Sequence, residues 1–128
     1  MNRSRFLAIA SILGLVVGLA FLLAPVQLMS FYGIALDPAG QWIGRFLGAQ
    51  LVGLATITWL ARNALTGGAL SAVMLGNLVG AVIALALAVL QGFSGIGNAL
   101  LWSTAVVYAF LAAGFGYFQF VRPQQHAD

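Results

Sequence analysis

The stretch from Asn63 to Val121 carries no charged side chain. In a soluble domain of ordinary composition about a quarter of the residues are charged, so a run of this length is not the surface of a water-soluble fold. Over the whole chain, 5% of the residues are charged, 62% are hydrophobic and the mean hydropathy is +1.06. We therefore expect lipid rather than water to surround most of the protein.

Four apolar stretches are each long enough to cross about 30 Å of hydrocarbon at about 1.5 Å per residue. The uncharged run contains two of them, because the polar, glycine-rich segment 91–98 interrupts it as a hairpin would. The sequence thus predicts an all-α fold: one transmembrane domain over residues 1–128, forming a four-helix bundle. The predicted helices cover residues 6–24, 42–61, 69–90 and 99–121.

The first apolar stretch follows Arg3 and Arg5, as the core of a signal peptide would. It is longer than the usual core of about 7–15 residues, and the segment 20–24 lacks a clear cleavage site between small residues. We expect it to be retained as the first span, with cleavage as the alternative.

The placement of the arginines predicts an orientation. Arg3, Arg5, Arg62 and Arg122 fall on one side of the four spans, and Arg45 falls on the other. Cytoplasmic loops carry an excess of positive charge, so both termini are expected in the cytoplasm, an N-in/C-in topology.

Residues 25–40 form the longest segment between predicted spans and are too apolar to extend freely into water. We expect them to lie along the outer interface as a short amphipathic turn or helix. The sequence Asp37-Pro38-Ala39-Gly40 at the end of this segment predicts a turn or an N-cap before the second span.

Small residues recur at every fourth position in all four predicted spans. Helices in lipid associate through close backbone approach, so these stripes predict a tight bundle, with an oligomer interface as the alternative. The longest stripe, on the third span, is the candidate packing interface: Ala72, Gly76, Gly80, Ala84 and Ala88.

A few polar residues within the spans form a candidate pocket: Arg45, Gln50, Asn77, Thr104 and Tyr108. Buried polar groups need partners in lipid, so the simplest interpretation is hydrogen bonding between helices. A solute or ligand pocket is the sharper alternative. For Arg45, which lies near the predicted outer boundary, anchoring at the headgroups or pairing with Asp37 competes with a ligand-binding role.

Few residues could support catalysis or metal binding. The chain has no cysteine, and its one histidine, His126, lies in the polar tail. Asp37 and Asp128 fall on opposite predicted sides, so they cannot form an acid/base pair. The arginines are scattered and build no face for nucleic acid. We expect no enzyme activity, no metal, no cofactor and no nucleic-acid partner.

Several short blocks carry a resemblance to a known group. They are Phe31-Tyr32-Gly33-Ile34, Asp37-Pro38-Ala39-Gly40, Arg45-Phe46-Leu47-Gly48-Ala49-Gln50 and Trp59-Leu60-Ala61-Arg62. Together they resemble the DoxX-like group of uncharacterised bacterial four-helix membrane proteins. The resemblance implies a bundle in the bacterial inner (cytoplasmic) membrane, with Arg45 and the following glycines as a shared packing element.

The sequence favours a structural or accessory subunit that packs against a larger membrane complex. This hypothesis rests on the missing catalytic groups and the small-residue faces. The alternative is an oligomeric small-solute pathway or a lipophilic-ligand-binding bundle built around Arg45, Gln50, Asn77 and Tyr108. The expected partners are membrane lipid and either such a complex or further copies of the chain.

Overall fold

The structure is a computed structural model that describes residues 1–64 and 66–121. Arg122, His126 and Asp128 lie outside the described residues, as do the predictions that rest on them. The described chain is helical: α1 (Arg3–Leu23), α2 (Pro25–Phe31), α3 (Pro38–Ala64), α4 (Gly67–Phe93), α5 (Leu101–Gly116) and the π-helical turn η1 (Tyr117–Val121).

Four helical segments are long and apolar enough to cross a membrane, which confirms the predicted all-α, four-span architecture: α1, α3, α4, and α5 with η1. The helices start and end up to four residues from the predicted limits, because capping groups set where a helix begins. The Asn2 side chain accepts a hydrogen bond from the Arg5 N–H at 2.9 Å. Asp37 accepts one from the Gly40 N–H at 2.7 Å, as the predicted N-cap requires.

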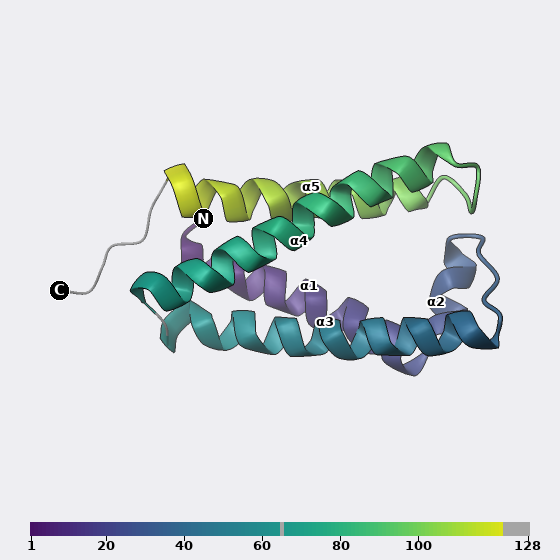
Figure 1. Cartoon of the computed structure of the whole chain (residues 1–128), viewed down its shortest axis with the longest axis horizontal. Helices are drawn as coiled ribbons and strands as arrows, with labels where there is room; N and C mark the ends of the chain where they lie inside the picture. The colour runs from purple at the N-terminus through teal and green to yellow at the C-terminus, as the bar shows by residue number, and fades with distance from the viewer. Residues whose placement is uncertain (65, 122–128) are drawn as a thin grey trace.

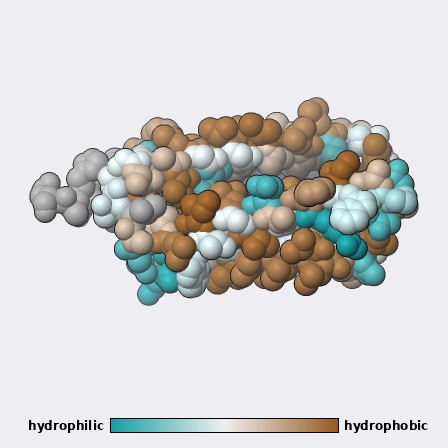
Figure 2. Space-filling model, turned by 60° about the horizontal axis from the view of Figure 1, so that its bottom comes forward, coloured by the Kyte–Doolittle hydropathy of each residue, from teal (hydrophilic) through white to brown (hydrophobic). Residues whose placement is uncertain are grey.

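The surface of the spans is apolar. Val16, Phe46, Leu87 and Val106, one from each long helix, are 62%, 69%, 61% and 69% exposed. Figure 2 shows apolar residues over much of one face, with hydrophilic residues toward the two ends and a smaller group near its middle. Such a surface is stable in hydrocarbon and not in water, so the chain is a multi-pass membrane protein.

The long helices are arranged as two pairs (Figure 1): α1 packs along α3, and α4 packs along α5. We call these the first pair and the second pair. Contacts between the pairs are sparse compared with those inside each pair. One end of the bundle holds the start of α1, the end of α3, the start of α4 and the C-terminal end of α5 with η1. We call this the termini end, and the opposite one the α2 end.

Glycines join the first pair. A Cβ atom added to Gly48 would lie 2.5 Å from the Gly18 carbonyl oxygen, and one added to Gly18 would lie 3.0 Å from the Gly48 carbonyl oxygen. In the same interface a Cβ added to Gly14 would lie 3.3 Å from the Ala55 Cβ, and one added to Gly44 would lie 3.6 Å from the Phe21 ring. The predicted internal packing of small residues is thus confirmed for these two spans.

Aromatic side chains close the termini end. Phe6 of α1 is fully buried, and its ring centroid lies 4.9 Å from that of Phe115 and 5.4 Å from that of Phe118. The remaining core residues of this cluster come from α1, α3 and α4, so that with Phe115 and Phe118 all four spans contribute: Leu7, Ala10, Ala61, Leu70 and Met74. The two pairs are therefore packed together at this end.

The α2 end is held by the loop between α4 and α5. Asn98 donates from its backbone N–H to the Tyr32 carbonyl at 2.9 Å and from Nδ2 to the Phe31 carbonyl at 3.1 Å. Its neighbour Gly97 has φ +82°, and an added Cβ would lie 2.6 Å from the Tyr32 oxygen, so this approach requires glycine. The predicted short helix after the first span is α2, and this loop binds its C-terminal end.

Candidate functional site

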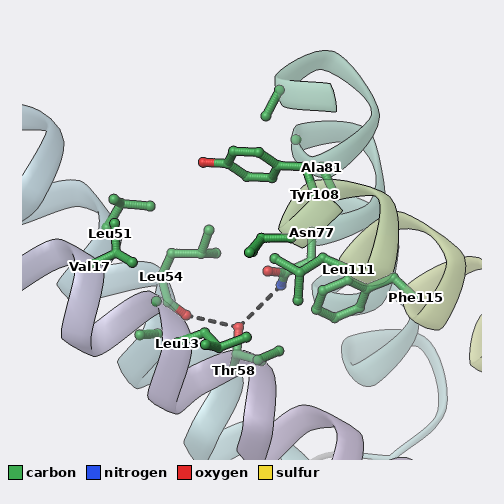
Figure 3. A pocket seen from close by; sticks show the side chains of 16 residues that line it. Leu13, Val17, Leu51, Leu54, Thr58, Asn77, Ala81, Tyr108, Leu111 and Phe115 are labelled. Carbon is green, nitrogen blue, oxygen red and sulfur yellow. Dashed lines mark hydrogen bonds between the residues drawn. The ribbon is translucent and has the colours of Figure 1, made fainter. Parts of the chain in front are cut away.

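A cavity of about 220 Å³ lies between the two pairs, in the middle of the bundle (Figure 3). Each of the four spans contributes four residues to its lining. They are Ala10, Leu13, Gly14 and Val17 of α1, Leu51, Leu54, Ala55 and Thr58 of α3, Asn77, Gly80, Ala81 and Ala84 of α4, and Val107, Tyr108, Leu111 and Phe115 of α5.

The cavity exists because small residues face it while larger groups hold the pairs together at the ends. Gly80, Ala81 and Ala84 of α4 leave the middle of that helix without bulky side chains toward the first pair. An added Cβ on Gly80 would meet nothing within 4 Å. The Phe6 cluster at the termini end and the Asn98 contacts at the α2 end fix the pairs on either side of this gap.

One hydrogen-bond chain crosses from the second pair to the first beside the cavity. Asn77 Nδ2 donates to Thr58 Oγ1 at 3.2 Å and to the Val73 carbonyl at 2.9 Å. The Thr58 hydroxyl in turn donates to the Leu54 carbonyl at 2.8 Å, as Figure 3 shows. Thr58 is 2% exposed, so this chain satisfies a hydroxyl that would otherwise be costly in lipid.

Two polar atoms of the lining remain without partners among the described residues. The Asn77 carbonyl oxygen Oδ1 accepts no hydrogen bond, and the Tyr108 hydroxyl makes none. In Figure 3 the Tyr108 ring extends from α5 across the gap toward the first pair, with its hydroxyl leading. The cavity thus combines an apolar wall with two available hydrogen-bonding groups, the pattern of small-molecule sites.

The structure brings together only part of the candidate polar pocket. Asn77 and Tyr108 line the cavity, and Thr104 is half-buried one helical turn from Tyr108, outside the lining. Gln50 is exposed on α3, away from the cavity. Arg45 is also exposed, and its guanidinium carbon lies 5.6 Å from the centre of the Trp42 ring.

Asp37 uses its carboxylate to cap α3, and no ion pair joins it to Arg45 among residues 1–64. The arrangement of Arg45 over Trp42 is one that interfacial side chains commonly adopt. It gives Arg45 no part in the cavity.

The candidate packing interface on α4 divides along its length. Ala72 and Gly76 are exposed, and an added Cβ on Gly76 would meet nothing within 4 Å. Gly80 and Ala84 line the cavity, and Ala88 is buried. This stripe therefore does not form a continuous internal contact of the kind that joins α1 to α3.

A second hollow is lined by residues of α1 and α3 alone, and both of its side-chain hydroxyl groups are already hydrogen-bonded. Ser11 and Thr56 line it, and their hydroxyls donate to the Leu7 and Val52 carbonyls of their own helices at 2.7 and 2.8 Å. The hydroxyl donors of this hollow are already used. The cavity between the pairs is therefore the better candidate site.

Thr58 is the site residue that the sequence interpretation missed. It continues the buried face of α3 that begins with Gly44 and Gly48 and includes Ala55, and helical spacing from those residues would have placed it inward. The described residues contain no cluster of three or more metal-binding side chains.

No family model, curated protein or solved structure matches the chain. The resemblance to the DoxX-like group and the expectation that the chain is not an enzyme both stay predictions.

Proposed function

We propose that this membrane protein binds a lipophilic molecule in the cavity between its two helix pairs. The observation that carries the proposal is the cavity itself: about 220 Å³, with walls from all four spans and two unpartnered polar atoms in an otherwise apolar lining. An empty apolar cavity of about 150 Å³ is large enough to bind benzene. A space of this size suits a molecule of about two fused rings or a short branched chain.

The cavity lies between apolar spans, and Val17, Leu54 and Val107 of its lining are partly exposed, which favours a ligand that enters from the bilayer. Leu13, Leu54 and Leu111 supply apolar walls, and none of the described residues that line the cavity is charged. An ionic solute would lose its hydration without gaining a counter-charge, which costs several kcal/mol or more. The proposal therefore selects lipophilic-ligand binding over a pathway for charged solutes.

Equilibrium dialysis of naphthalene between nanodiscs that contain the protein and matched empty nanodiscs tests the proposal. We expect saturable binding of one naphthalene per chain above simple partition into lipid. Ala84→Phe fills the cavity and should weaken binding at least tenfold, while Ala86→Phe, on the same helix but exposed and outside the lining, should not. Absence of saturable binding, or equal binding by Ala84→Phe, would overturn the proposal.

A second candidate is the accessory role, in which the protein packs against a larger membrane complex in a bacterial inner membrane. It is favoured by the exposed face of α4 at Ala72 and Gly76, where a partner helix could approach the backbone closely. Copurification after mild detergent extraction tests it. Partner proteins should be lost in Gly76→Leu and kept in Gly53→Leu, and a wild-type chain that always runs alone would contradict it.

We also propose the N-in/C-in orientation, in which both termini lie in the cytoplasm. Arg3, Arg5 and Arg62 lie at the termini end of the described structure, and Arg45 lies toward the other end. Labelling of single cysteines placed at Asn2 and Ala35, in intact spheroplasts, should modify only Ala35→Cys. Modification of Asn2→Cys alone would reverse the orientation.

A further inference from the structure

The polar groups of the cavity define the chemistry of the molecule it would hold, and this step rests on the proposed function. We infer that the cavity selects a lipophilic alcohol or phenol: a molecule with an apolar body and a hydroxyl that donates a hydrogen bond to Asn77 Oδ1. The inference follows from the hydrogen bonds of Asn77 and Thr58, which use the amide nitrogen of Asn77 and leave its oxygen available to a ligand.

The orientation of the Asn77 amide is determined by its neighbours. The amide atom 2.9 Å from the Val73 carbonyl oxygen must be the nitrogen, because a carbonyl oxygen cannot donate a hydrogen bond. The same nitrogen donates to Thr58 Oγ1, whose own proton is used on the Leu54 carbonyl. Both amide protons thus have acceptors inside the protein, and flipping the amide would place oxygen against oxygen.

The amide therefore offers only an acceptor to a ligand. Its oxygen has no partner among the described residues, and Figure 3 shows it on the side of the amide that faces the gap between the pairs. A ligand whose polar group is an ether, ester or ketone would set a second acceptor against Oδ1 and leave it unsatisfied. A ligand hydroxyl supplies the missing proton, and it also leaves its own oxygen free to accept.

The Tyr108 hydroxyl does not alter this selection. A phenolic hydroxyl both donates and accepts, so Tyr108 can serve an alcohol, an ether or a ketone equally well. Its role is to add affinity for any ligand with an oxygen atom. The preference for a donor comes from Asn77 alone, and the two residues can be separated by experiment.

The remaining lining excludes a strongly polar ligand. Apart from Asn77, Tyr108 and Thr58, the thirteen lining residues have side chains without polar atoms, and the Thr58 hydroxyl already donates to the Leu54 carbonyl. A molecule with several hydroxyls would bury groups that find no partner, each at a cost comparable to a lost hydrogen bond. The ligand class is thus limited to molecules with one or two adjacent polar atoms.

The test compares 1-naphthol with 1-methoxynaphthalene, its methyl ether, which keeps the ring and the oxygen but lacks the proton. Naphthalene serves as the reference with no polar atom. Binding to protein in nanodiscs is measured by equilibrium dialysis and corrected for partition into matched empty nanodiscs. We expect the wild-type protein to bind 1-naphthol roughly tenfold more tightly than the ether.

Two variants assign the preference. Asn77→Leu should reduce the naphthol-to-ether ratio to about one, and continued binding of naphthalene shows that the cavity has stayed intact. Tyr108→Phe should weaken binding of the alcohol and the ether by a similar factor and leave the ratio roughly tenfold.

Each outcome has a distinct meaning. Equal affinity for the alcohol and the ether in the wild type, or an unchanged ratio in Asn77→Leu, overturns the selection of a donor while the binding proposal stands. If neither compound nor naphthalene binds saturably to the wild type, the proposed function itself fails. A naphthol-to-ether affinity ratio that falls only in Tyr108→Phe would assign the selection to Tyr108 and would also refute the inference.

Discussion

The interface between α1 and α3 and the gap between the two helix pairs are both lined by small residues, yet one is closed and the other open. In the first, Gly18 and Gly48 bring two backbones into contact, and no room remains for a methyl group on either residue. In the second, Gly80, Ala81 and Ala84 face a cavity of about 220 Å³. Small residues therefore permit two helices to approach closely but do not enforce that approach.

What separates the two regions is the set of contacts at their ends. The first pair is in close contact from Gly44 to Ala55: Gly44 meets Phe21, and the small residues Gly48 and Ala55 meet Gly18 and Gly14. The two pairs, in contrast, meet through bulky side chains around Phe6 at one end and through the Asn98 loop at the other. These end contacts keep the middle apart, so hydrogen-bonding groups on the inward faces can serve a ligand.

The largest expected effect is at the closed interface. In Gly48→Leu, the new side chain would start 2.5 Å from the Gly18 oxygen and 2.6 Å from the Leu22 nitrogen, both backbone atoms that cannot turn away. We expect a loss of about 3 kcal/mol or more in the free energy of unfolding, measured by titration with SDS in mixed micelles. Gly53→Leu is the control, because an added Cβ there meets nothing within 4 Å. Equal losses of unfolding free energy in Gly48→Leu and Gly53→Leu would show that the interface is not closed.

The next effect is at the α2 end. Asn98→Ala removes the hydrogen bond from Nδ2 to the Phe31 carbonyl, which joins the second pair to α2, and the local one that Oδ1 accepts from the Leu100 N–H. The loss should be about 1 kcal/mol or more. The chain has no cysteine, so spin labels can be placed at Ile43 and Leu90, which are exposed on α3 and α4. The distance distribution between these labels should broaden in Asn98→Ala.

Ser94→Ala provides the control for that experiment. The Ser94 hydroxyl donates to the Gln91 carbonyl in the last turn of α4 and accepts from the Ile96 N–H, so it makes no bond to α2. An unchanged distribution in Asn98→Ala, or equal broadening in both variants, would show that the loop does not hold the pairs.

A smaller effect is expected for the hydrogen bond that crosses the gap. Thr58→Val removes the hydroxyl that accepts from Asn77 Nδ2, and interhelical hydrogen bonds in membranes contribute about 0.6 kcal/mol on average. Unfolding titrations of Thr58→Val, Asn77→Leu and the double variant measure the coupling. If the losses of unfolding free energy in the two single variants add up to the loss in the double variant, the bond contributes nothing to the association of the pairs.

The smallest effect on stability is expected inside the cavity. Ala84→Leu adds carbon where space exists, so the free energy of unfolding should change by less than about 1 kcal/mol. Gly48→Leu and Ala84→Leu both enlarge a small residue on an inward helix face, so only the space around each residue should separate their effects. A loss as large as that of Gly48→Leu would mean that the gap is already filled.

The spans could be predicted because hydropathy is summed along one segment and needs no knowledge of its neighbours. The arrangement of the pairs could not, because stripes of small residues occur on every span and nothing local shows which stripes meet. The contact of Gly44 and Gly48 with α1 sets the rotation of α3, and that rotation turns Gln50 outward and Thr58 inward. The sequence predicts Asn77 and Tyr108 as site residues because a polar group within a span needs a hydrogen-bonding partner. That both line one cavity depends on the tertiary structure, which no local pattern reveals.

The most direct test of the account is a crystal structure of the protein under xenon pressure. Xenon enters dry apolar cavities, and we expect one strong xenon site between Leu13, Leu54 and Leu111 in the wild type, which disappears in Ala84→Phe and persists in Ala86→Phe. Helix pairs that close against each other in the middle of the bundle, with no xenon between them, would contradict the existence of the site.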